Sequence, residues 1–312
     1  MKYVIRKLVT TFITLFAVSA LVFFSFSVIP GNPAIAKLGT EATVERVQAL
    51  THEMGLDRPV LTRYAEWIRG IFRGDFGNSY SYNTSVTGLL SEKIGTTLIL
   101  SILAILLTVV ISFPFGIYCA RKSDSKIDVF LTGFNQLIMA VPSFFSGILI
   151  TLLFGFLFKL FTPGAYVSYK ISFGKCIGYL LFPALAIALP KISMVVKLLK
   201  DTTIKEAEKE YVVTAYSRGN ATRAVFYKHV LKNAMIPVIT FLGMTFADII
   251  AGSIIVEQVF SVPGLGRILL TSISGRDYPV VEAIILLLAA FVVISNMLVD
   301  FMYRLFDSRI KI

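Results

Sequence analysis

The sequence predicts an all-α polytopic membrane protein with six transmembrane helices and a small extracytoplasmic subdomain between the first two. Two observations predict this class. Of the 312 residues, 56% are hydrophobic and only 16% are charged, whereas soluble domains carry about 25% charged residues. The apolar residues also gather into long runs, and a helix needs roughly 20 such residues to cross a bilayer core of about 30 Å.

The composition also excludes other classes of protein. The net charge of +11 could suggest a nucleic-acid partner, but Lys and Arg lie mainly beside the apolar runs, where they act as topology signals. The two cysteines, Cys119 and Cys176, have neither metal-site spacing nor a disulfide pattern. The two histidines lie far apart in the sequence. We therefore expect no nucleic-acid partner, no metal site and no cofactor on this chain.

The first predicted span, residues 9–29, contains no charged residue. Lys2, Arg6 and Lys7 precede it, so the N-terminus should be cytoplasmic. The apolar run is longer than the core of a signal peptide, which favours a retained helix over a cleaved signal.

Five further apolar segments complete the predicted bundle. They are residues 96–120, 129–158, about 178–199, 235–256 and 283–299. The fourth is interrupted by Pro183 and Pro190, which neighbouring helices can accommodate. Six spans place both termini in the cytoplasm. The cytoplasmic segments then hold 18 Lys and Arg residues, against five in the outer segments once the long outer loop is set aside, as the positive-inside rule requires.

The one large outer segment, residues 30–95, is predicted to be ordered. Residues 41–54 have helical composition, and residues 63–72 form an amphipathic helical pattern that contains the sole tryptophan, Trp67. A glycine-rich turn follows. After the fifth span, residues 256–267 predict a Gly/Pro turn and the start of a short amphipathic piece. These features favour a small subdomain over a disordered loop.

Four polar side chains within the predicted spans are candidates for a translocation path. Asn135 and Gln136 lie in the third span, where such residues either join helices or line a polar path. Lys191 lies some 13 Å from the cytoplasmic end of the fourth span and Asp248 about 18–20 Å inside the fifth. A charge at such depth must be paired or wetted. We expect the two to pair or to line a translocation path; the alternative is that Lys191 reaches the inner membrane surface.

A charged, helix-prone loop, residues 200–233, interrupts this apolar chain. Residues 204–216 and 222–232 predict two helices, separated by Gly219 and Asn220. Such a helix pair could fit a groove on a partner protein. The alternative is a helix pair that lies on the membrane surface without a partner.

No catalytic motif accompanies this loop. The sequence contains no G-x-x-x-x-G-K-[ST], no H-E-x-x-H and no G-x-S-x-G. We therefore predict that the chain is not an enzyme, and that any ATP hydrolysis takes place on another subunit.

An ordered set of short motifs runs along the whole chain. It comprises P-G-N-P at 30–33, G-L-D-R-P at 55–59, G-D-F-G-N-S at 74–79, P-G-L-G at 263–266, R-D-Y-P at 276–279 and, in the charged loop, Glu210, Tyr211, Thr214, Ala215, Arg218, Gly219, His229, Asn233 and Ala234. In this arrangement the sequence resembles ABC-transporter importer permeases of the dipeptide/oligopeptide/nickel class, and the loop resembles their EAA signature. Lys191 departs from the family pattern, in which an uncharged residue is common.

The resemblance implies a permease subunit of an ATP-driven importer that forms half of a translocation path for peptides by alternating access. The loop residues from Glu210 to Asn233 would then couple the chain to the ATPase, with Gly219 at the turn of the coupling helix. The implied partners are a second homologous permease, two cytoplasmic ATPase subunits that bind ATP and Mg, and an extracytoplasmic substrate-binding protein. The implied location is the plasma membrane of a bacterium or archaeon.

Three alternatives remain open at this point. The same permease class also serves nickel and metal–chelator complexes. An ion-coupled secondary transporter would use Lys191 and Asp248 as its coupling pair, and a membrane scaffold would transport nothing. For the domains, we expect an N-terminal helix at 1–29, the outer subdomain at 30–95 and a five-helix core at 96–312 that contains the loop 200–233.

Overall fold

The computed structural model describes residues 2–123 and 125–306, and helices make up most of both ranges. Neither range contains a strand, in agreement with the predicted all-α class; the one isolated bridge joins Asn78 and Ser85. The chain divides into two compact units. The first unit comprises Met1–Thr97 and Val262–Val293, and the second unit comprises Leu98–Ser261 and Ile294–Ile312. The predicted domain bounds at 29 and 95 stay a prediction.

Five helices in the described ranges are long and apolar enough to cross a membrane. They are α1 (Lys2–Val28), α5 (Val86–Arg121), α8 (Phe173–Ala207), α13 (Tyr278–Phe306) and the continuous helix Thr222–Val259, which ends in α11 (Leu231–Val259). Four of them contain one of the predicted spans, and α1 covers all of the predicted first span, residues 9–29, except its last residue. A sixth span is obtained if a bent pair of helices is counted as one, so the predicted number is reached only with that pair.

The bent pair corrects the third predicted span. Residues 129–158 do not form one straight helix: α6 (Lys126–Ala140) and the segment formed by α7 (Ser143–Ile150) and the π-helical η2 (Thr151–Leu157) meet at 100°. The cause is Pro142, because a residue that precedes proline is driven out of the helical region. Val141 accordingly has extended backbone angles, φ −81° and ψ 122°.

In the fourth span, proline has no such effect. The helix α8 continues for 35 residues through Pro183 and Pro190. It is also the most buried of the long apolar helices, and packing of this kind can hold a helix together where proline removes a hydrogen bond.

Helix α8 forms the centre of the second unit together with α5 and α11. Val195, Leu199 and Val238 are buried there, and side chains of all three helices pack around them. A methyl group on Gly116 of α5 would come within 2.9 Å of the Leu199 side chain, so glycine allows the close approach of α5 and α8. Near this contact, Lys200 makes an ion pair with Asp128 of α6 at 2.7 Å.

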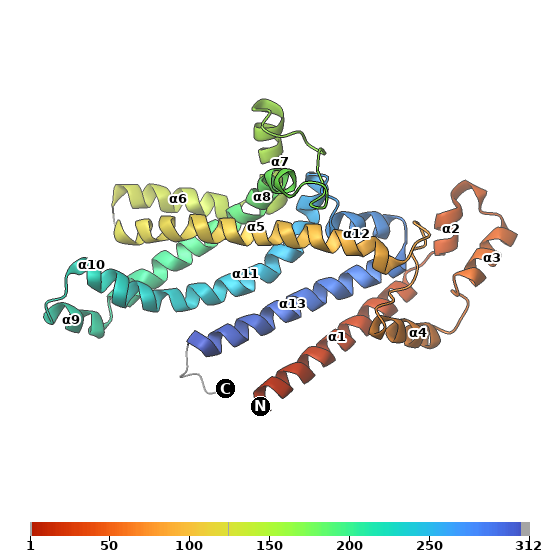
Figure 1. Ribbon diagram of the computed structural model, residues 1–312, viewed down its shortest axis with the longest axis horizontal. Helices are drawn as coiled ribbons and strands as arrows, with labels where there is room; N and C mark the ends of the chain where they lie inside the picture. Colours follow the sequence, from red (N-terminus) through yellow and green to blue (C-terminus); the bar gives the residue numbers. More distant parts are fainter. Residues whose placement is uncertain (1, 124, 307–312) are drawn as a thin grey trace. The chain divides into compact units, whose positions relative to one another are not determined.

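The first unit confirms the predicted order of the outer segment. Residues 41–54 contain α3 (Val44–Glu53) and residues 63–72 belong to α4 (Val60–Phe72); α2 (Pro33–Leu38) and the short η1 (Gly39–Glu41) precede them. Figure 1 shows α4 beside the C-terminal half of α1. The Phe23 ring of α1 lies 5.3 Å from Tyr64 and 5.6 Å from Trp67, measured between ring centroids. Aromatic packing therefore joins the outer helices to the first span.

Asp277 organises the loop that follows α4. It lies between α12 (Leu265–Ser274) and α13, is fully buried, and accepts a hydrogen bond from the Ser79 hydroxyl. The backbone N–H groups of Tyr80 and Ser81 also donate to it, at 2.9 and 3.1 Å. One carboxylate thus fixes three consecutive residues that are about 200 positions away in the sequence.

We expect Asp277→Asn to loosen this loop. The amide keeps one acceptor oxygen and turns an NH₂ group toward the donors, and a buried donor without an acceptor costs about 1–3 kcal/mol. Hydrogen exchange at the Tyr80 and Ser81 amides should therefore become faster. In the control Asp75→Asn, the exposed side chain that accepts from the Gly77 N–H keeps its acceptor oxygen, so exchange at Tyr80 should not change. Unchanged exchange in Asp277→Asn would contradict this role.

Candidate functional site

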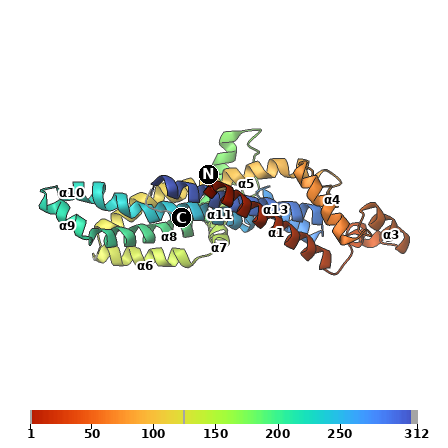
Figure 2. The ribbon, with the colours of Figure 1, turned by 90° about the horizontal axis from the view of Figure 1, so that it is seen from below.

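The charged loop 200–233 forms a small helical protrusion. Helix α8 ends at Ala207, and α9 (Glu210–Ser217), α10 (Thr222–Val225) and the π-helical η3 (Phe226–Val230) lead into α11. Figures 1 and 2 show α9 and α10 at the end of α8 and α11 where the chain turns back. The predicted helix 204–216 is in fact divided, because Lys209 has extended backbone angles, φ −74° and ψ 146°. The predicted helix 222–232 continues into the fifth span.

Gly219 forms the turn between α9 and α10, as predicted. Its φ is +79°, a region that residues with a side chain rarely adopt. Its N–H donates to the Tyr216 carbonyl at 2.9 Å, and the Asn220 side-chain amide donates to the Ala215 carbonyl at 2.9 Å. A methyl group at Gly219 would meet nothing within 4 Å. The backbone conformation, rather than lack of space, therefore requires glycine here.

The protrusion has its own apolar core. Val212, Ala215, Val225 and Val230 are buried together, with Tyr211 packed against them. On the outside of α9, Val213 and Tyr216 remain exposed. The protrusion is therefore a folded element that presents apolar side chains outward.

Tyr211 connects three helices at the base of the protrusion. Its hydroxyl donates to Glu206 of α8 at 2.9 Å and accepts from the Asn233 amide of α11 at 3.1 Å. Burial is the main reason why the pKa of Tyr211 is raised, so the hydroxyl stays a donor at neutral pH. Glu206 also pairs with Lys209 at 2.6 Å, and this contact raises the pKa of Lys209.

The structure brings some of the predicted loop residues together and leaves others apart. Tyr211 and Asn233 are hydrogen-bonded, and the His229 carbonyl lies 3.4 Å from the Tyr211 hydroxyl. Thr214 donates to the Glu210 carbonyl within α9, and Arg218 is exposed. The sequence did not predict a role for Glu206, which accepts the hydrogen bond of Tyr211. Its position, five residues before Tyr211 in the charged loop, was a usable signal of this contact.

Lys191 and Asp248 form an ion pair between α8 and α11. Lys191 Nζ lies 3.0 Å from Asp248 Oδ2, and their side chains are 19% and 66% exposed. The pairing inferred from depth in the membrane is therefore present. The wide exposure of Asp248 leaves one side of the pair accessible.

We expect Lys191→Met and Asp248→Asn to be non-additive. Each single change leaves one charge without its partner, whereas the double change removes both. Contacting residues of this kind interact by about 0.5–3 kcal/mol. In reconstituted vesicles, the transport rate of the double variant should exceed the product of the two single effects. Simply additive losses would show that the pair has no joint role.

Asn135 and Gln136 differ in their surroundings. Asn135 is buried and its amide donates to the Ser193 carbonyl of α8 at 2.8 Å, which is the contact expected of a residue that joins two helices. Gln136 is exposed. A place for either residue in a translocation path stays a prediction.

Comparison with known proteins identifies the family. The long apolar helices define an integral membrane protein. Residues 112–312 match the family described as "Binding-protein-dependent transport system inner membrane component", and residues 1–101 match the N-terminal component of such systems. The chain belongs to this family and is a permease subunit of an ABC importer.

The relatives match along the whole chain. A probable peptide ABC transporter permease protein, y4tP, from Sinorhizobium fredii is 30% identical, over 99% of both chains. The oligopeptide transport system permease protein AppB of Bacillus subtilis is 29% identical, again over 99% of both chains. A crystal structure of an amino acid ABC transporter is similar, with a TM-score of 0.52 and 19% identity; the match covers 70% of this chain and 94% of that one. This last likeness supports the fold.

Proposed function

We propose that this chain forms half of a membrane path for peptides and that ATP hydrolysis on partner subunits drives transport. The full-length relatives named as peptide permeases support the substrate class. Nickel and metal–chelator complexes are the second choice within the class. The described residues contain no group of three metal-ligating side chains, so nothing there favours the metal.

The observation that carries the proposal is the folded protrusion at α9 and α10. Its exposed Val213 and Tyr216 suit a groove on a cytoplasmic ATPase, because exposed apolar side chains beside a rigid turn are suited to docking. The coupling residues would be Glu210, Tyr211, Thr214, Ala215, Arg218, Gly219, His229 and Asn233. We also propose that both termini lie in the cytoplasm, on the same side of the membrane as the ATPase.

The hydrogen bonds of Tyr211 suggest how a movement of the ATPase would reach the spans. Tyr211 belongs to α9, Glu206 to α8 and Asn233 to α11. A displacement of α9 would therefore act on two spans at once, and those spans also carry the Lys191–Asp248 pair. This arrangement fits alternating access, in which ATP binding closes the ATPases and hydrolysis resets the path.

The test is reconstitution of the chain with its partners. These are a second permease, two ATPase subunits with ATP and Mg, and an extracytoplasmic binding protein, in bacterial or archaeal lipid. Uptake of tri-alanine that requires ATP and stops with vanadate is the expected result. Uptake of nickel alone would reassign the substrate. Transport by this chain alone under an ion gradient would instead identify a secondary transporter and overturn the proposal.

A further inference from the structure

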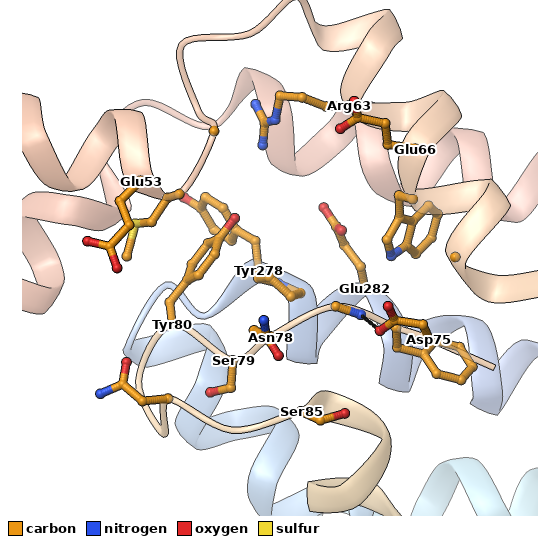
Figure 3. Close-up of a pocket in the computed structure, with 18 of the residues that line it drawn as sticks. Glu53, Arg63, Glu66, Asp75, Asn78, Ser79, Tyr80, Ser85, Tyr278 and Glu282 are labelled. Atoms are coloured by element: carbon orange, nitrogen blue, oxygen red, sulfur yellow. Dashed lines mark hydrogen bonds between the residues drawn. The ribbon is translucent and has the colours of Figure 1, made fainter. Parts of the chain in front are cut away.

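The first unit contains an open pocket of about 700 Å³, lined entirely by its own residues. It lies among α3, α4, the loop fixed by Asp277 and the start of α13. Its volume falls within the range of about 300–1,000 Å³ that is usual for small-molecule sites. Figure 3 shows Glu282 and Arg63 pointing toward one another across it.

Glu282 is the notable residue of this pocket. It is 6% exposed, which is costly for a carboxylate unless it has partners. Within the described residues, no group donates a hydrogen bond to it, and its electrostatic partner is Arg63. Arg63 is itself engaged elsewhere: it contacts the Tyr80 hydroxyl, and its guanidinium lies 5.7 Å from the centre of the Phe23 ring. Glu282 therefore retains the capacity to bind a cation.

Three aromatic residues, Trp67, Tyr80 and Tyr278, also line the pocket, and aromatic rings attract cations. The Trp67 Nε1–H and the Tyr278 hydroxyl are buried and have no partner among the described residues. Burial raises the pKa of Tyr80 to about 12, so its hydroxyl stays neutral. The pocket thus offers the carboxyl group of Glu282 and a lining rich in aromatic residues.

We infer that this pocket binds the amino terminus of a short peptide, with the α-ammonium group at Glu282 beside the aromatic residues of the lining. An ammonium group supplies the donors that Glu282 lacks, and the neighbouring aromatic rings attract a cation. Arg58 lines the same pocket and can receive the carboxylate at the other end of the peptide. The inference rests on the proposed peptide function and assigns a binding site on the outer subdomain.

Trp67 provides a direct measurement, because it is the only tryptophan of the chain. The full-length chain in detergent micelles is titrated with tri-alanine and, separately, with N-acetyl-tri-alanine, while tryptophan emission is followed. We expect a saturable change with tri-alanine and at least tenfold weaker binding of the acetylated peptide, which lacks the ammonium group. Equal binding of the two peptides would overturn the inference, and this comparison needs no variant.

Glu282→Gln tests the assigned residue with little change in shape. Its affinity for tri-alanine should fall at least tenfold, whereas Glu45→Gln, an exposed glutamate of α3 outside the pocket, should bind as the unmodified chain does. Elution volume and emission without peptide show whether the variant is folded. Undiminished binding by Glu282→Gln would overturn the assignment.

The outcomes separate this inference from the proposed function. ATP-driven uptake of tri-alanine without any change in Trp67 emission would overturn the pocket and leave the peptide function standing. If there is neither ATP-driven uptake of tri-alanine nor a change in Trp67 emission, both the peptide function and the pocket assignment are overturned. An emission change produced by the binding protein without peptide would show that a protein side chain fills the pocket, which also overturns the peptide assignment.

Discussion

Replacement of Gly219 by valine is expected to reduce ATPase stimulation by loaded binding protein at least tenfold in the reconstituted transporter. Gly219 has a φ of +79°, and a left-handed conformation costs about 1–2 kcal/mol for residues with a Cβ. Valine, which is branched at Cβ, is especially unfavourable there. The turn should therefore change shape, and α9 should no longer present the surface that the ATPase contacts. The rate of phosphate release measures the effect.

Gly219→Asn is the matched control, because asparagine adopts left-handed angles more readily than other residues. A Cβ at this position meets nothing within 4 Å, so the two variants differ mainly in how well they tolerate the backbone conformation. The asparagine variant should keep most of the stimulation, and both variants should be inserted in the membrane in normal amounts. Full stimulation in Gly219→Val would contradict the coupling role.

Replacement of Lys200 by methionine is expected to destabilise the second unit by about 3–5 kcal/mol, the usual cost of removing one partner from a buried ion pair. Lys200 Nζ lies 2.7 and 2.8 Å from the two carboxylate oxygens of Asp128 and 3.0 Å from the Thr132 hydroxyl. Both charged side chains are at least 85% buried. Thermal unfolding of the detergent-solubilised chain measures the loss.

Two further variants show whether the pair itself is responsible. The double variant Asp128→Asn/Lys200→Met contains neither charge and should recover most of the lost stability. Lys197→Met removes an exposed lysine from the same helix and should leave the unfolding temperature nearly unchanged. If the double variant is as unstable as Lys200→Met, the loss arises from packing and not from the negative charge that remains on Asp128.

Several features of this structure followed from local sequence patterns. The helical composition of residues 41–54 and the amphipathic pattern of residues 63–72 correspond to α3 and α4, because the period of apolar residues reports the helical face directly. Gly219 correctly predicted the turn between α9 and α10, because few other residues tolerate a positive φ. Counting residues from the membrane surface also placed Lys191 and Asp248 at similar depths, and the two are paired.

Other features depend on contacts that local patterns do not contain. Pro142 was visible within the third span, yet Pro183 and Pro190 show that proline alone does not decide between a bend and a continuous helix. The partner of Lys200 lies 72 residues away, and nothing around either residue indicates the other. Glu282 lies one residue before the predicted sixth span, 283–299, and no role was predicted for it. A charged residue at the edge of a long apolar run was nevertheless a usable signal of a functional residue.

The π-helical turn η3 has a geometric consequence for the protrusion. The Leu231 N–H donates to the carbonyl of Phe226, five residues earlier, so this turn contains one residue more than an α-helical turn would. Each residue rotates an α-helix by about 100°. Loss of a single residue from η3 would therefore turn α10, and α9 with it, by roughly that angle about the axis of α11. The direction in which the exposed face of α9 points thus depends on the length of this five-residue segment.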